Sequence, residues 1–210
     1  MRERSPFVVA GAGVDFPAMS NTRLLLIAPL VTLCAWPSAN GQAPPDPRTR
    51  IAAQKQAMAR LAFLDGAWRG QASSIGPSGK HTLTQTERVG PFLDGAVKVI
   101  EGRGYEADGT IGFNAFAIIS YDPDKQTYSM RSYAQGRAGD FPLTMTPDGF
   151  SWEMSFGSMT IRYSATVKNG TWHEVGDRIP AGGEPVRFFE MTLTRIGDTD
   201  WPAAGAVTMK

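Results

Sequence analysis

From Gly66 onward, turn signals recur every eight to twelve residues, and this spacing constrains the fold more than any other feature of the chain. Asp-Gly and Asn-Gly pairs supply the positive φ angles that tight hairpin turns require. Between the turns lie short runs rich in β-branched and aromatic residues, several of which alternate apolar with polar positions. The pattern predicts about ten strands, over residues 67–75, 80–89, 96–105, 111–121, 126–134, 140–146, 149–156, 159–168, 171–179 and 186–196.

Strands joined in sequence by tight turns form an antiparallel meander. A long meander tends to curl and close, because closure removes the unpaired edges of the sheet. We therefore predict an all-β fold, an up-and-down antiparallel barrel of about ten strands, over residues 65–198. An open β-sandwich is the alternative. The tail over residues 199–210 is expected to be irregular, with Trp201 packed against the barrel.

Residues 44–64 form a linker and an amphipathic helix. Pro44-Pro45-Asp46-Pro47 is a stiff spacer in which Asp46 is a candidate N-cap and Pro47 the first helical residue. Asp65-Gly66 would end the helix, since glycine commonly follows the last helical turn. Apolar side chains spaced by seven and three residues mark one face, namely Ile51, Met58, Leu61 and Leu64. We expect this face to pack over one end of the barrel.

Residues 1–43 have the character of a leader. Residues 19–43 contain a short polar stretch with one positive charge, an apolar run from Leu24 to Trp36 and a small-residue region, the pattern of a signal peptide. Residues 1–18 show no period and are interpreted as an over-extended start before Met19. The apolar run is shorter than the roughly 20 residues that span a bilayer. We expect a periplasmic or secreted protein without a stable membrane span after leader removal; a membrane anchor and lipid-modified Cys34 are the alternatives.

The motif Gly66-x-Trp68-x-Gly70, which follows a short helix and opens the first strand, resembles the opening motif of the calycin superfamily. That superfamily includes lipocalins, fatty-acid-binding proteins and nitrobindin-like barrels. The chain is most similar to a family of exported bacterial lipocalin-like proteins of unassigned function, through its turns Phe92-Leu93-Asp94-Gly95 and Ser120-Tyr121-Asp122. The resemblance implies a lipocalin-like barrel in which Trp68 crosses the closed end and Arg195 of the last strand lies over it.

The resemblance also bears on cofactors. Nitrobindin-like barrels hold haem through a histidine near the start of the last strand, and the corresponding segment here, Pro185 to Glu190, contains none. We therefore expect no cofactor, with axial ligation of haem by His173 as the alternative. The sequence contains no His pair at metal-ligand spacing and no Gly-x-Ser-x-Gly elbow, so no metal site and no catalytic residue is assigned.

Polar side chains within strands of otherwise buried character are the candidates for ligand binding. Arg131 and Tyr133 share one strand face, and both could donate hydrogen bonds to an anion in a dry cavity; the alternative is a solvated outer face. Charged groups that would need partners inside a barrel also lie on strand faces beside aromatic residues. The complete candidate set is Arg131, Tyr133, Trp152, Tyr163, Trp172, Glu174, Arg178 and Glu190.

The predicted function is the binding of a small hydrophobic or amphipathic molecule inside the barrel. The net charge of +1 and the lack of a basic stripe argue against a nucleic-acid partner. The first alternative is a barrel enzyme with isomerase- or cyclase-type acid–base chemistry, with Glu153, His173 and Glu174 as the first bases to test. A structural protein with a filled barrel is the second. Nothing in the sequence indicates the oligomeric state.

Overall fold

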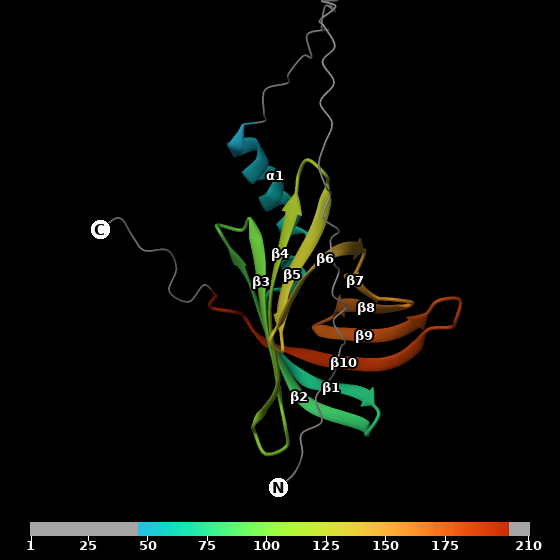
Figure 1. Ribbon diagram of the computed structural model, residues 1–210. Helices are drawn as coiled ribbons and strands as arrows, with labels where there is room; N and C mark the ends of the chain where they lie inside the picture. Colours follow the sequence, from blue (N-terminus) through green and yellow to red (C-terminus); the bar gives the residue numbers. More distant parts are fainter. Residues whose placement is uncertain (1–45, 202–210) are drawn as a thin grey trace, which may run out of the picture. The chain divides into compact units, whose positions relative to one another are not determined.

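The computed structural model describes residues 46–201, so the predicted leader and the last nine residues of the chain lie outside the described residues. Ten antiparallel strands form the body of the protein, and each predicted strand is present (Figure 1). The strands are β1 (Gly66–Gly76), β2 (Gly79–Phe92), β3 (Val97–Tyr105), β4 (Ile111–Asp122), β5 (Thr127–Ala134), β6 (Arg137–Thr146), β7 (Gly149–Phe156), β8 (Met159–Lys168), β9 (Thr171–Pro180) and β10 (Val186–Gly197).

The sheet is a closed barrel in which every strand pairs with its neighbours in the sequence, and β1 pairs with β10 to complete the ring. The prediction of an up-and-down barrel is confirmed, and the alternative of an open sandwich is wrong. The ring is weakest between β6 and β7. Their pairing covers only Leu143–Thr146 against Gly149–Trp152, so residues 137–142 and 153–156 have no partner across this seam.

Helix α1 (Pro47–Ala59) begins as the sequence predicts. The Asp46 carboxylate accepts a hydrogen bond from the Arg48 amide at 3.0 Å, and Pro47 occupies the first helical position. The prediction that the helix continues to Leu64 is wrong. The amides of Arg60 and Leu61 bond to carbonyls three residues back, which tightens the last turn, and a separate 3-10 turn, η1 (Ala62–Leu64), follows.

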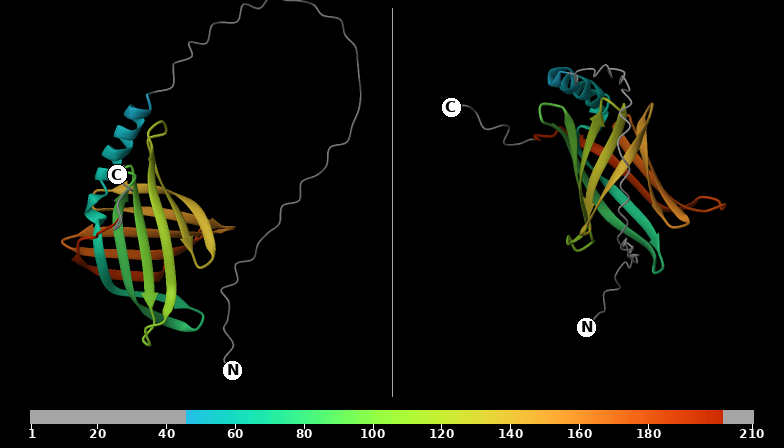
Figure 2. Two further views of the ribbon diagram at one scale, coloured as in Figure 1. Left: turned by 90° about the vertical axis from the view of Figure 1, so that its left-hand side faces the viewer. Right: turned by 45° about the horizontal axis from the view of Figure 1, so that its top comes forward.

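Helix α1 lies at one end of the barrel (Figure 2). Its side chains form ion pairs with the turns that follow β2 and β4, through Lys55 with Asp94 and Arg50 with Asp124. These pairs are solvent-accessible and contribute little to stability. Burial of apolar side chains at the end of the helix stabilises the packing more: Met58, Leu61 and Leu64 are buried, whereas Ile51 of the predicted stripe is 46% exposed.

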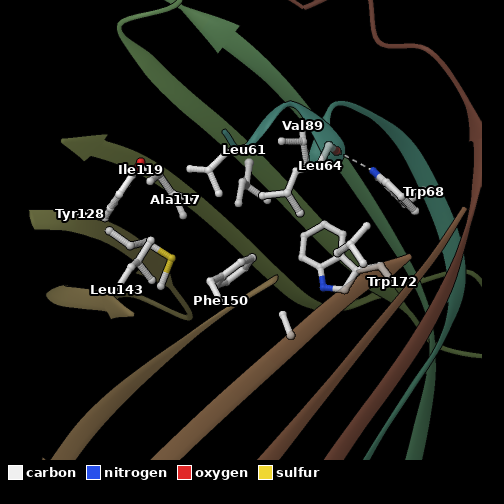
Figure 3. Packing of buried hydrophobic residues seen from close by; sticks show 14 of the residues in the cluster. Leu61, Leu64, Trp68, Val89, Ala117, Ile119, Tyr128, Leu143, Phe150 and Trp172 are labelled. Atoms are coloured by element: carbon white, nitrogen blue, oxygen red, sulfur yellow. Dashed lines mark hydrogen bonds between the residues drawn. The ribbon is translucent and has the colours of Figure 1, made fainter. Parts of the chain in front are cut away.

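Trp68 fills the helix-capped end from the inside (Figure 3). Its side chain is 1% exposed, its indole nitrogen donates to the Leu64 carbonyl at 2.9 Å, and its ring meets the edge of Trp172 at 5.8 Å. Backbone conformation and close packing explain why glycine occurs two residues before and two residues after Trp68. Gly66 has a φ of +138°, and a Cβ at Gly70 would overlap the Thr192 carbonyl oxygen of β10.

Arg195 is the register partner of Trp68 across the β1–β10 pair. Its guanidinium donates to the Asp65 carbonyl at 3.2 Å and also pairs with Asp198 at 2.6 Å, so it ties the last strand to the start of the first. Beside it, the Lys98 side chain is 3% exposed and pairs with the Asp65 carboxylate. The capped end therefore combines an aromatic plug with a largely buried ion pair.

Trp201 packs on the outer wall of the barrel. Its ring meets Phe92 edge-on at 5.7 Å, and the Arg88 guanidinium lies 4.1 Å from the ring centroid. Within residues 46–201, the one α-helix is too short and too polar to cross a membrane.

Candidate ligand-binding site

The barrel encloses a cavity of about 730 Å³. Its lining includes Ala134 and Arg137, which flank the β5–β6 turn, and Ser155 and Phe156, which precede the β7–β8 turn. In an antiparallel barrel these turns lie at the end opposite the β2–β3 and β4–β5 turns that α1 covers. The cavity therefore occupies the half of the barrel away from the helix.

Side-chain size explains why this half is hollow. Strands β4 and β5 turn small residues toward the interior, and these leave space that larger side chains would fill. The small residues are Ala115, Ala117, Ser132 and Ala134. The other wall is aromatic: Trp152 and Tyr163 stack with ring centroids 4.4 Å apart and planes 11° from parallel, and Phe189 meets Tyr163 at 5.6 Å. The cavity thus has one wall of small side chains and one wall of aromatic side chains.

The unpaired stretches of β6 and β7 both border the cavity. Residues 137–141 of β6 and 152–156 of β7 contribute to its lining, on the two sides of the seam where the ladder stops. Phe141 and Trp152 contact each other across the seam with centroids 4.9 Å apart. We name this gap, with its apolar residues Phe141, Trp152, Met154 and Phe156, the β6–β7 slot. Along this slot the barrel wall is formed by side chains, without backbone pairing between β6 and β7.

Glu87 is the first of two carboxylic acids inside the cavity. It accepts a hydrogen bond from the Gln85 amide at 2.7 Å, and Gln85 is itself 3% exposed. Gly102 on β3 makes room for this carboxyl group, because a Cβ at that position would lie 2.6 Å from Glu87 Oε1. Burial raises the pKa of Glu87 to about 8, against the lowering effect of the Gln85 hydrogen bond.

Glu174 is the second acid, on β9. Its carboxylate accepts a hydrogen bond from the indole nitrogen of Trp172 at 3.2 Å, and burial raises the pKa of Glu174 to about 7. The negative charge of Glu174 adds to the rise in the pKa of Glu87, so the two groups share one electrostatic environment. Burial, followed by the charge of Glu174, raises the pKa of Tyr163 to about 12. At neutral pH Glu174 is therefore close to half-protonation, and Glu87 is mostly protonated.

Four of the predicted ligand-binding residues come together in the lining of this cavity, namely Trp152, Tyr163, Trp172 and Glu174. Arg178 lies two residues beyond Gly176 on the same face of β9 and does not line the cavity. Its guanidinium is 4.4 Å from the Phe188 ring centroid and donates to the Ile75 carbonyl at 3.4 Å. Arg178 is thus held at the rim, by an aromatic face and a backbone oxygen.

Arg131 and Tyr133 lie on the solvated outer face, the alternative that the sequence left open, and not on the inner face that a ligand-binding role would need. Met130 and Ser132 occupy the inner face of β5, so the alternate residues face outward. Tyr133 is 44% exposed, and the Arg131 guanidinium bonds to Tyr133 Oη at 2.9 Å and to the Asp140 carboxylate at 2.6 Å. These residues form a polar cluster on the outer wall.

Glu190, a candidate ligand-binding residue, also lies on the outer face and not inside the barrel. The β9–β10 register pairs Glu174 with Met191, and Glu190 with Val175. Glu190 therefore meets His173 on the outside, with 3.0 Å between the carboxylate and the imidazole Nε2. His173 faces away from the cavity. Glu153 borders the cavity at the β6–β7 seam, where its carboxylate pairs with Arg162 at 2.5 Å, so of the three bases considered for an enzyme only Glu174 lines the cavity without an ion pair.

Gln85 and Glu87 were not identified from the sequence. Their spacing could have indicated them, because both lie at alternate positions of β2 from Val89, an apolar residue that is fully buried, and so share its strand face. Within the part of the chain that the structure describes, no three His, Cys, Asp or Glu side chains gather closely enough to hold a metal ion.

The fold and the cavity define the class of protein as a closed ten-stranded barrel with a hollow interior. A similar fold is found in the crystal structure of Rv2717c from M. tuberculosis, with a TM-score of 0.50 and 10% sequence identity, over 66% of this chain and 96% of that chain. This likeness concerns the fold alone. No protein-family profile matches the sequence, and no curated protein is significantly similar to it.

Proposed function

We propose that this protein is a lipocalin-like binding barrel of the calycin type, which holds a small hydrophobic or amphipathic molecule in its cavity. The observation that carries the proposal is the cavity itself, about 730 Å³ in volume and lined mainly by aromatic and aliphatic side chains. Binding pockets for small molecules have volumes of roughly 300–1,000 Å³ and combine an apolar wall with a few convergent polar groups. A purely structural barrel would have no reason to keep this half unfilled.

The proposal is tested by closing the cavity. Ala115→Phe adds a ring on the inner face of β4, where Ala115 lines the cavity, and should abolish retention of a copurified molecule. Asn114→Phe adds the same ring on the outer face and serves as the control. Native mass spectrometry of protein purified gently from its own host measures the retained mass. An apo mass for the wild type, with no retained molecule and no binding of apolar probes, would contradict the proposal.

The second candidate function is proton-transfer catalysis on a bound molecule. The pKa values of about 8 for Glu87 and about 7 for Glu174 favour it, because general acids and bases work best when their pKa lies near the working pH. Once a ligand is identified, its incubation with the protein in deuterated water provides the test. Exchange of carbon-bound hydrogen that Glu174→Gln abolishes would support an enzyme. If the ligand shows no exchange, catalysis is contradicted and binding remains as the proposed function.

We also propose that the barrel is exported, on the pattern of residues 19–43. N-terminal sequencing of the protein recovered from the host's extracytoplasmic fraction tests this, since a mature chain should begin near residues 40–44. Recovery of the uncleaved chain from the cytoplasm would contradict it.

A further inference from the structure

The polar chemistry inside the cavity is acidic. Glu87 and Glu174 each accept one hydrogen bond, from Gln85 and Trp172 respectively, and neither forms an ion pair within residues 46–201. Carboxylates enclosed in a protein are normally matched by cations, because an unmatched buried charge is costly. A ligand that brings a positive charge would supply the missing match.

The nearby cations are engaged elsewhere. Lys98 pairs with Asp65 at the capped end, and Arg178 lies at the rim over Phe188. The one basic residue in the cavity lining is Arg137, which is exposed beside the β5–β6 turn. An anionic headgroup placed at the two acids would therefore meet like charge without compensation, which disfavours fatty-acid-type ligands.

The aromatic wall adds a second preference. The rings of Trp152, Tyr163 and Trp172 line the cavity together with the carboxyl group of Glu174. Ring faces attract ammonium groups, most strongly when water is excluded. A carboxylate and aromatic faces within one largely apolar pocket form a suitable environment for an ammonium group bonded to an apolar chain.

We propose that the ligand is an amphipathic amine, whose ammonium group binds at Glu87 and Glu174 and whose apolar part extends along Trp152 toward the β6–β7 slot. This inference rests on the proposed binding function and specifies its ligand class. The ammonium group favours the ionised form of these carboxyl groups, which are partly or mostly protonated at neutral pH, so the protein releases protons as the amine binds. Amine affinity should therefore rise between pH 6 and pH 8.5.

The other titratable groups around the two acids do not change this expectation. Glu101 lies on the outer face of β3 behind Glu87, and its charge opposes ionisation of Glu87 in the same direction as burial. Tyr163 stays neutral below pH 10, since its pKa is raised to about 12. At the slot, Asp140 and Glu153 are paired with Arg131 and Arg162 on the outside. The positions that β4, β5 and β10 contribute to the cavity lining carry no ionisable side chain.

The test compares decylamine, 1-decanol and decanoic acid, three probes with the same alkyl chain, by isothermal titration calorimetry at pH 8.5 and at pH 6. We expect decylamine to bind at least tenfold more tightly than decanol at pH 8.5, and decanoic acid to bind most weakly. Titration in two buffers of different ionisation enthalpy should show proton release with the amine alone.

Substitutions of the two acids test whether they bind the ammonium group. Glu87→Gln and Glu174→Gln should each weaken decylamine binding at least tenfold more than they change decanol binding, whereas Glu190→Gln on the outer face should change neither. If a Gln variant fails to fold, the pH dependence in the wild type carries the test. Decanol or decanoic acid binding as tightly as decylamine would overturn the inference and leave the proposed function standing. If no probe binds and the native protein retains no molecule, the proposed function itself fails.

Discussion

The two halves of this barrel share one sheet but have opposite interiors. The helix-capped half is filled by large side chains that are essentially inaccessible, Leu61, Leu64, Trp68, Val89, Ile119 and Leu193. The other half contains the cavity and is lined on one side by alanine and serine. The backbone ladder between neighbouring strands is shortest at the β6–β7 seam, where it comprises four residue pairs. The capped half thus provides stability, and the hollow half provides the space in which chemistry can take place.

The two halves also differ in how their charged side chains are compensated. In the capped half, Lys98 is buried with its partner Asp65, so the charge is satisfied by the protein itself. In the hollow half, Glu87 and Glu174 have only neutral hydrogen-bond donors. The capped end is complete without a ligand, whereas the cavity leaves two acids whose charge a ligand could compensate.

The largest expected effect comes from opening the capped end. Trp68→Ala removes a fully buried ring and its hydrogen bond to Leu64, and should lower the free energy of unfolding by about 4 kcal/mol. Trp152→Ala, at the β6–β7 slot, should cost only about 1 kcal/mol, because its ring borders empty space. Urea unfolding measures both. Equal losses would show that the two halves do not differ in packing.

A smaller effect is expected from the ion pair. Asp65→Ala leaves Lys98 buried without its partner and should cost roughly 3 kcal/mol, near the lower end for a buried pair because Asp65 is partly exposed. The double variant Asp65→Ala with Lys98→Met should recover more than half of that loss in urea unfolding. A double variant as unstable as the single one would show that the charge of Lys98 is not the cause.

The smallest effect concerns pH. The pKa of Glu87 is raised from 4.5 to about 8, so the folded protein binds a proton more tightly than the unfolded chain. Stability is therefore highest below pH 4.5 for this group and falls as the pH rises through 8. From pH 5 to pH 8.5 the wild type should lose on the order of 2 kcal/mol more than Glu87→Gln.

The control for this comparison is Asp108→Asn. Hydrogen bonds from Thr110 lower the pKa of Asp108, so that group has already titrated below pH 5 and its removal should leave the slope unchanged. The stability of the wild type and of Glu87→Gln is measured by urea unfolding at the two pH values. Parallel pH profiles would show that folding does not raise the pKa of Glu87.

The strands were predictable because their determinants are local. Gly109 of Asp108-Gly109 and both residues of Asn169-Gly170 adopt positive φ with little strain, and the alternating runs between the turns have a period of two. The start of α1 was predictable for the same reason, through the Asp46 cap and Pro47. Its end was not, because the last turn depends on packing of Leu61 and Leu64 against the barrel.

The site was predictable in part. Aromatic residues of β7, β8 and β9 were placed correctly in one group because their strands alternate strongly. Arg131 and Glu190 were misplaced because alternation defines two faces without saying which one is inside. Glu87 was missed because its burial depends on Gly102, a residue of the neighbouring strand.

The sequence by itself determined the number and order of the strands, the turns between them and the beginning of the helix, since each follows from interactions among residues close in the chain. Only the tertiary structure decided which strand faces point inward, where the barrel is hollow and where backbone pairing between β6 and β7 stops. Those properties depend on the register between strands and on the summed volume of side chains from every strand. The raised pKa values of Glu87 and Glu174 follow from that burial and from no local pattern.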